Sequence, residues 1–419
     1  MKYFKVILTT ALLFCITAAQ AQKYVGGDIS LLTRYEDNGA IYMDKDGKKI
    51  TDVLAFLKEQ GMNAMRVRLF VDPSLASDED KGEGVCQDIE FVKRLGKKIK
   101  DAGLMLMLDF HYSDTWADPG QQATPQLFLS VNTPAYNYIY HYTKESLEAL
   151  VKAGATPDFI QTGNEITYGM MWDSGCKVEA NSAWDGYKDD NWENFTTALK
   201  NAGKACREVC PDAKIIIHTE RVPNPPQIID FYKKIDKYGV DYDIIGTSYY
   251  PYHHGNVKQL DKAITEFESN FPSKDIMVVE TGCDYHYAMV EDENTGYPLT
   301  YEGQRQFTED LITTLNKHKQ VNGLFWWFLE ANEYGLDWKT QRVTDGWYNA
   351  SLFDNETGKA LPALYELKNF NDSETGIQDV RTEAAANNDA WYSLDGRKLN
   401  TAPHQKGLYI KSHQKVILR

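Results

Sequence analysis

Short apolar strands alternate with longer amphipathic segments along most of this sequence, and no other feature restricts its fold as strongly. Strands are expected at residues 24–29, 64–70, 104–110, 157–162, 214–218, 242–249, 275–280 and 323–328. Helices are expected at residues 50–60, 89–102, 138–152, 192–209, 226–237, 257–270, 303–317 and 361–370. Strand–helix units with parallel, right-handed crossovers predict an α/β fold, a (β/α)8 TIM barrel. Long connections follow the fourth, seventh and eighth strands, so enlarged βα loops are expected on one face.

Two of the predicted strands end on a glutamate. One runs into the sequence Gly-Asn-Glu, which ends at Glu165, and the other ends at Glu280. The carboxyl ends of the strands carry the active-site residues of a TIM barrel. A pair of carboxylates at that place is typical of enzymes that cleave glycosidic bonds. Glutamates are ordinarily solvated, but both of these follow apolar runs and neither lies among other charges. We therefore interpret them as a catalytic pair.

The first residues of the sequence are interpreted as a signal peptide over residues 1–21. Two lysines precede an apolar run, and the small residues of Ala-Gln-Ala end at Ala21, as in a cleavage site. Export to the periplasm, the cell surface or the medium is therefore expected. Lipidation of Cys15 is ranked second, because the bulky Phe14 precedes it where a small residue is required. No later run is long and apolar enough to span a bilayer.

The predicted barrel is assigned to residues 22–371, and the composition changes after it. Residues 372–388 are polar and rich in alanine, and we predict that they form a linker. Residues 389–419 are predicted to form a small all-β appendage with strands at 391–399, 407–411 and 415–418. Its segments Leu-Asp-Gly-Arg and Gly-Leu-Tyr-Ile resemble the sorting-type tails of secreted Bacteroidetes proteins. An incidental β appendage is the alternative.

The balance of charges restricts the kind of partner. The sequence holds 60 acidic and 45 basic residues, for a net charge of −15. A nucleic acid is not expected as a partner, because phosphate backbones are bound by basic surfaces. Such a surface does not repel a neutral polysaccharide, and 26 tyrosines and 9 tryptophans provide rings on which sugars stack. We expect a monomer that acts on a polysaccharide.

Several motifs lie at the ends of the predicted strands. They are Gly-Gly-Asp-Ile-Ser at 26–30, Arg-Val-Arg-Leu-Phe-Val-Asp-Pro at 66–73, Asp-Phe-His-Tyr-Ser-Asp-Thr-Trp-Ala-Asp-Pro at 109–119, Gly-Asn-Glu at 163–165, Ile-Gly-Thr-Ser-Tyr-Tyr-Pro-Tyr at 245–252, Val-Glu-Thr-Gly at 279–282 and Gly-Leu-Phe-Trp-Trp at 323–327. In these motifs the chain resembles glycoside hydrolase family 53, the arabinogalactan endo-β-1,4-galactanases. The long motif at 109–119 is highly specific.

The resemblance implies a role for each matching residue. Glu165 would be the general acid/base and Glu280 the nucleophile of a retaining double displacement, with their carboxyl groups about 5–5.5 Å apart. Asn164 would hold the sugar 2-hydroxyl. Arg66 or Arg68 could keep Glu280 ionised, and either could equally be a structural ion pair. The expected substrate-binding residues are Asp28, Arg68, His111, Asp114, Trp116, Asn164, His218, Tyr249, Trp327 and Trp347.

The implied activity is internal cleavage of β-1,4-galactan, as in the side chains of pectin. Aromatic residues of the long loops suit an open groove in which successive sugars stack: Trp172, Trp184, Tyr285, Tyr297, Tyr334 and Trp347. The alternatives are another retaining endo-β-glycanase of the same barrel clan, acting on glucan, xylan or mannan, and a glycan-binding barrel without catalysis. Some relatives hold calcium after the seventh strand. The acidic residues 291–294 offer oxygen ligands there, but a surface loop explains them equally, so no cofactor is assigned.

Overall fold

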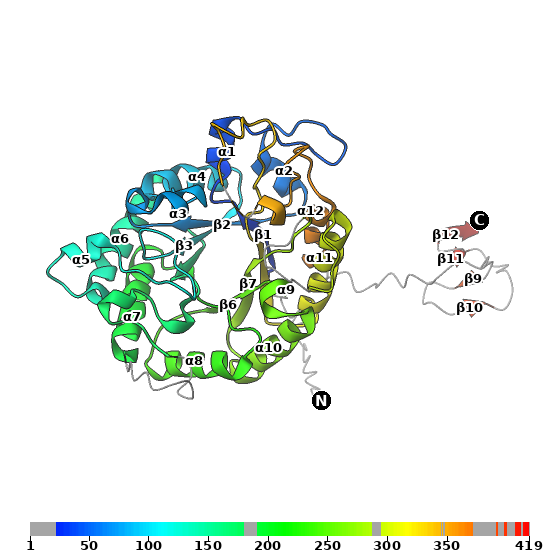
Figure 1. Cartoon of the computed structure of the whole chain (residues 1–419). Coiled ribbons are helices and arrows are strands. Elements are labelled where there is room, and N and C mark those ends of the chain that lie inside the picture. Colours follow the sequence, from blue (N-terminus) through cyan, green and yellow to red (C-terminus); the bar gives the residue numbers. More distant parts are fainter. Residues whose placement is uncertain are drawn as a thin grey trace, which may run out of the picture. The chain divides into compact units, whose positions relative to one another are not determined.

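Parallel strands close into a barrel in the order in which they occur along the chain (Figure 1). The computed structural model describes residues 22–179, 191–286, 295–344, 346 and 348–371, and four short strands beyond them. The barrel strands are β1 (Tyr24–Asp28), β2 (Ala64–Leu69), β3 (Met105–Phe110), β4 (Phe159–Thr162), β5 (Lys214–Thr219), β6 (Ile244–Tyr249), β7 (Asp275–Thr281) and β8 (Val321–Trp326). β1 pairs with both β2 and β8, which closes the cylinder. The predicted (β/α)8 barrel is confirmed.

Helices surround this cylinder (Figure 1). They are α1 (Leu32–Asn38), α2 (Val53–Glu59), α3 (Asp78–Gly82), α4 (Ile89–Asp101), α5 (Gln126–Ser130), α6 (Ala135–Ala153), α7 (Trp192–Val209), α8 (Pro225–Lys237), α9 (Pro251–His254), α10 (Val257–Asn270), α11 (Tyr301–Leu315) and α12 (Pro362–Glu366). Side-chain caps fix several starts: the Asp88 carboxylate accepts from the N–H of Phe91, and the Thr300 hydroxyl accepts from that of Gly303. The short helices α1, α3, α5 and α9 lie in loops and were not predicted. None of the helices in the described ranges is long and apolar enough to cross a membrane.

The closing helix differs from its prediction at residues 361–370. α12 ends at Glu366, and a 3-10 helix, η5 (Leu367–Phe370), continues the chain. Leu364, Leu367 and Phe370 are all fully buried and are spaced by three residues. A 3-10 helix places residues three apart on one face, so this spacing favours it over a further α-helical turn.

Apolar side chains fill the barrel interior and the layer between strands and helices. The interior cluster includes Met107, Phe159, Ile216 and Phe325. At Gly323 a Cβ would lie 2.4 Å from the Met277 side chain, so β8 accepts no larger residue there. Toward the carboxyl ends of the strands the buried residues become polar. This change from apolar to polar marks the face that carries chemistry.

The chain beyond the barrel forms a separate compact unit, which begins at residue 374. Its described strands are β9 (Trp391–Tyr392), β10 (Lys398–Leu399), β11 (Gly407–Lys411) and β12 (Gln414–Leu418). They pair in an antiparallel sheet of order β10-β9-β11-β12. The predicted signal peptide at 1–21 and the predicted linker at 372–388 lie outside the described residues, so both stay predictions, as does the sorting role of the tail.

Candidate active site

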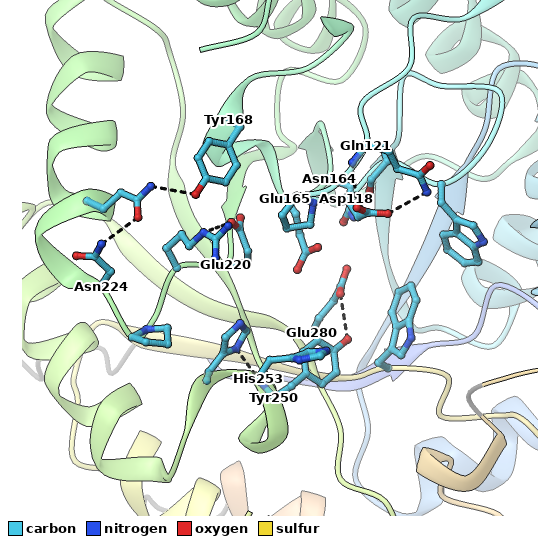
Figure 2. A pocket seen from close by; sticks show the side chains of 18 of the residues that line it. Asp118, Gln121, Asn164, Glu165, Tyr168, Glu220, Asn224, Tyr250, His253 and Glu280 are labelled. Atoms are coloured by element: carbon cyan, nitrogen blue, oxygen red, sulfur yellow. Dashed lines mark hydrogen bonds and ion pairs between the residues drawn. The ribbon is translucent and has the colours of Figure 1, made fainter. Parts of the chain in front are cut away.

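A cleft of about 1150 Å³ opens where the barrel strands end (Figure 2). Each of its walls is a segment that follows a strand. Residues 116–121 follow β3, residues 164–168 and 177–179 follow β4, and residues 220–227 follow β5. Residues 250–254 follow β6, while β7 and the end of β8 provide Glu280 and Trp327. The two predicted catalytic glutamates therefore line the same cleft, although they are far apart in the sequence.

Glu165 and Glu280 extend toward one another across the cleft (Figure 2). The Ser248 hydroxyl lies between them, 2.6 Å from Glu165 Oε1 and 3.5 Å from Glu280 Oε2. These two oxygens are therefore within about 6 Å of each other, which agrees with the separation of about 5–5.5 Å in retaining glycosidases. Ser248 carries no charge, so it links the carboxyl groups without neutralising either.

His218, on β5, lies beside Glu165. Its Nδ1 lies 3.0 Å from Gln161 Nε2, 3.0 Å from Asn164 Oδ1 and 3.3 Å from the backbone nitrogen of Glu165. Its Nε2 lies 2.8 Å from Ser248 Oγ. The Ser248 hydroxyl donates to Glu165 Oε1. His218 and Ser248 therefore connect Glu165 to the side-chain amides of Gln161 and Asn164.

The backbone at Glu165 is in the left-handed region, with φ 48° and ψ 53°. Such a conformation in a residue other than glycine costs about 1–3 kcal/mol and is common at functional sites. It ends β4 sharply and begins the 3-10 turn η2 (Ile166–Tyr168). Gln122 supports the turn by donating from Nε2 to the carbonyl of Asn164 at 2.8 Å. The strained turn projects the Glu165 side chain into the cleft.

Arg66 is the cation beside Glu280. Its Nη2 lies 2.7 Å from Glu280 Oε1 and 2.8 Å from Asp109 Oδ2, and its Nη1 lies 3.0 Å from Asp28 Oδ2. Tyr250 donates its hydroxyl to Glu280 Oε2 at 3.1 Å. The sequence left open which arginine serves Glu280, and the structure places Arg66 there.

Arg68 has a different set of neighbours. It pairs with Asp28 at 2.7 Å, and its guanidinium lies 4.9 and 4.7 Å from the ring centres of Trp116 and Trp327. It therefore supports the two tryptophans from behind, through cation–π contacts. Both rings line the cleft.

The two glutamates differ in proton affinity. Burial raises the pKa of Glu165 well above its usual range, and the charge of Glu280 raises it further. Burial also raises the pKa of Glu280, but the Arg66 guanidinium opposes this and holds it to about 7. Glu280 therefore ionises first, and Glu165 keeps its proton. Two carboxyl groups whose pKa values are separated in this way are suited to act as nucleophile and acid.

Asn164 also lines the cleft, and it is held on two sides. Its Oδ1 accepts from Arg66 Nη2 at 2.9 Å, and its Nδ2 donates to the carbonyl of Ala117 at 2.8 Å. The second hydrogen on Nδ2 remains for a ligand. Trp347 lies outside the described residues.

The remaining predicted substrate-binding residues do not line the cleft: Asp28, Arg68, His111, Asp114, His218 and Tyr249. All but Asp114 are buried behind it. The Asp114 carboxylate accepts from the N–H groups of Asp72 and Gln126 and so shapes a loop. Tyr249 donates its hydroxyl to the carbonyl of Gly255 and packs on Phe307, on the helix side of β6. Side chains alternate along a strand, so Tyr249 points away where Ser248 points in.

The aromatic residues expected to line a groove are also placed differently. Trp172, Tyr285, Tyr297 and Tyr334 do not line the cleft, and Trp184 is not among the described residues. Trp172 donates from its ring to the carbonyl of Tyr168 and lies beneath the Lys177 ammonium, 4.1 Å from its ring centre. The other three are held by neighbouring segments: the Tyr285 hydroxyl accepts from Asn355, the Tyr297 hydroxyl donates to Asp310, and the Tyr334 carbonyl accepts from the N–H of Ile41.

Several residues of the site were not predicted. Ser248 and Tyr250 lie within a recognised motif but were given no role. Glu220 follows β5 directly, so the rule that found Glu165 and Glu280 could have found it. Asp118 lies within the motif at 109–119 but was given no role, whereas Tyr168 and Gln121 lie outside the motifs and carry no comparable signal.

Within the described ranges, no group of three or more His, Cys, Asp or Glu side chains is arranged to hold a metal ion. The acidic residues 291–294, considered as calcium ligands, lie outside those ranges.

Comparison with known proteins agrees with this geometry. The model of the family "Glycosyl hydrolase family 53" matches residues 24–367. An endo-beta-1,4-galactanase of Bacillus subtilis (strain 168) is 26% identical over 380 residues, which cover 81% of this chain and 84% of that protein. A solved Ignisphaera aggregans GH53 catalytic domain is 30% identical, with a TM-score of 0.70 over 82% of this chain and 95% of that one. A fungal β-1,4-galactanase structure is 26% identical, with a TM-score of 0.68 over 83% and 99%.

Proposed function

The chain belongs to glycosyl hydrolase family 53, and on this premise we propose that it cleaves β-1,4-galactan internally, with retention of the β-anomer. One observation carries the proposal: the half-buried carboxyl group of Glu165 and the buried one of Glu280 share the Ser248 hydroxyl, while a cation contacts only Glu280. This asymmetry prepares Glu280 as a nucleophile and Glu165 as an acid.

In the first step Glu280 attacks the anomeric carbon of the sugar on the glycone side of the bond. Arg66 and Tyr250 hold its carboxylate and orient it. As the glycosidic C–O bond breaks, Glu165 gives its proton to the leaving oxygen, which departs as a hydroxyl group. A covalent galactosyl–Glu280 ester remains.

In the second step Glu165, now a carboxylate, takes a proton from a water molecule. That water attacks the anomeric carbon from the side that the leaving sugar vacated, and the bond to Glu280 breaks. Two inversions at one carbon give net retention. Glu165 is again protonated and Glu280 again ionised, so the enzyme is ready for the next bond.

The size and lining of the cleft support a polymeric substrate, and the galactanases among the relatives support galactan. A volume of about 1150 Å³ exceeds the range of about 300–1,000 Å³ found for sites that hold one small ligand, so several sugar units fit. Trp116 and Trp327 offer apolar ring faces for the C–H faces of sugars. The second amide hydrogen of Asn164 can donate to a sugar hydroxyl beside the reacting carbon.

A panel of β-linked polysaccharides tests the proposal, with galactan, glucan, xylan and mannan compared at equal mass. On galactan, viscosity should fall much faster than reducing ends appear, and NMR spectra of early products should show the β-anomer first. Release of galactose alone with little loss of viscosity would contradict internal cleavage. Activity confined to another polymer would contradict the substrate, and early α-anomer would contradict the double displacement.

A further inference from the structure

A third carboxyl group, that of Glu220, lies in the cleft and takes no part in the mechanism above. It follows β5 directly, and its side chain is buried with only 3% of its surface exposed. A carboxyl group is costly to bury unless its oxygens have partners. The partners of Glu220 are therefore informative about its role.

Glu220 joins the loop after β5 to the turn that carries Glu165. Thr167, two residues after Glu165, donates its hydroxyl to Glu220 Oε2 at 2.7 Å. The other oxygen, Oε1, lies 3.1 Å from Arg221 Nε. The same two segments also meet at Tyr168, whose ring centre lies 5.0 Å from the Arg221 guanidinium carbon. Figure 2 shows Glu220 and Tyr168 on one side of Glu165.

We propose that Glu220 is a positioning residue for Glu165: through Thr167 it holds the strained turn in place, and its carboxylate sets a second negative charge beside the acid. The inference rests on the proposed role of Glu165. A left-handed backbone at Glu165 needs such support, because its conformation is costly and persists only where neighbours fix it.

The charged and titratable groups that face Glu165 come from several elements. Glu280 is on β7, Glu220 follows β5, and Asp118 follows β3, and all three carboxylates disfavour ionisation of Glu165. Burial lowers the pKa of His218 well below its usual value, so this ring is neutral. The nearby cations, Arg66 and Arg221, pair with Glu280 and Glu220, respectively.

The direction of the effect follows from these groups. Burial raises the pKa of Glu220 to about 7, against the hydrogen bond from Thr167 and the charge of Arg221. Glu220 is therefore ionised on the alkaline side of the activity range, where Glu165 must still hold its proton. A negative charge there raises the pKa of Glu165 and extends activity to higher pH.

The test compares pH profiles of kcat/KM for the full chain and three variants, on the polysaccharide that the panel identifies. Glu220→Gln keeps an acceptor for Thr167 but removes the charge, so its alkaline limb should move about 0.5–1 unit lower. Glu208→Gln, a control at a carboxylate on the outer surface of α7 that pairs with Lys144, should leave that limb in place. Thr167→Val removes the hydroxyl contact and should lower kcat several-fold with little change in KM.

An alkaline limb that coincides in Glu220→Gln and the wild type would overturn the role of the charge. If Thr167→Val keeps the wild-type kcat, Glu220 does not position Glu165 through Thr167. This variant also decides the question if Glu220→Gln does not fold. If the wild-type chain does not cleave galactan, the proposed function is refuted. The role of Glu220 can still be tested, because the variants are compared on whichever polymer the wild type cleaves.

Discussion

Arg66→Lys should weaken both the fold and the nucleophile. The Arg66 guanidinium contacts Asp28, Asp109, Asn164 and Glu280 at distances from 2.7 to 3.0 Å, and it is completely buried. A lysine is a single point of charge on a flexible stem and cannot reach all four partners. Each hydrogen bond to a charged group contributes about 1.5–3 kcal/mol. Losing one or two, with carboxylates left buried, should cost about 3–5 kcal/mol.

Thermal unfolding followed by circular dichroism measures this loss. In a barrel of this size about 3–5 kcal/mol corresponds to a fall in Tm of roughly 4–7 °C. The matched control is Arg94→Lys, because Arg94 pairs with Asp37 at 2.8 Å on the surface, where both side chains are more than half exposed. Such a pair contributes at most about 1 kcal/mol, so this variant should melt within about 2 °C of the wild type.

The activity of Arg66→Lys gives a second readout. With its counter-charge displaced, Glu280 should ionise only at higher pH, so the acid limb of kcat/KM should move upward while the alkaline limb stays. The reasoning is refuted if Arg66→Lys has the same Tm as Arg94→Lys and if its pH profile of kcat/KM keeps the wild-type acid limb. In that case the buried arginine would be neither a structural centre nor the group that tunes the nucleophile.

Three further predictions concern the catalytic pair and the tail. Glu280→Gln should lose several orders of magnitude in kcat on galactan with an unchanged circular dichroism spectrum, and near wild-type turnover would remove Glu280 from its role. Glu165→Ala should still cleave an aryl β-galactoside with a good leaving group. Added azide should accelerate turnover, because the anion attacks the anomeric carbon of the galactosyl–Glu280 ester without a general base and displaces Glu280. An absence of any azide effect counts against Glu165. A chain that ends at Asn371 should keep the wild-type kcat/KM and unfold in one transition, because the cleft and the barrel core lie before that residue. If this shortened chain is insoluble, the prediction is wrong.

The barrel could be predicted because its signals are local. The spacing of apolar residues along β2 or α7 depends only on neighbours in the sequence, and α7 begins and ends where it was expected. The two catalytic candidates could be found for the same reason: each is a glutamate at the carboxyl end of a short apolar run, Glu165 after Gly163 and Asn164, and Glu280 directly after Val279. Their meeting in one cleft follows from the topology, because parallel strands bring their carboxyl ends together.

The direction of individual side chains could not be predicted. The pairing of β6 with β7 shifts after Thr247, so that Ser248 lies opposite Glu280. Such an irregularity re-aims side chains and leaves no trace in the periodicity. Tyr249 was assigned to the cleft from the motif at 245–252, but side chains alternate along β6, so it points to the helices while Ser248 faces the cleft. The choice between Arg66 and Arg68 likewise depends on contacts among four strands, which a linear pattern does not contain.

Trapping the intermediate shows whether Glu280 forms a covalent bond to the sugar while Glu165 protonates the leaving group. A 2-deoxy-2-fluoro-β-galactobioside with a dinitrophenolate leaving group should form the ester quickly and hydrolyse it slowly, since fluorine slows both steps and the leaving group accelerates only the first. Mass spectrometry of the intact chain should show one added disaccharide, and peptide mapping should place it on Glu280. A label on Glu165 or on another residue, or no label in a chain that cleaves galactan, would contradict the account.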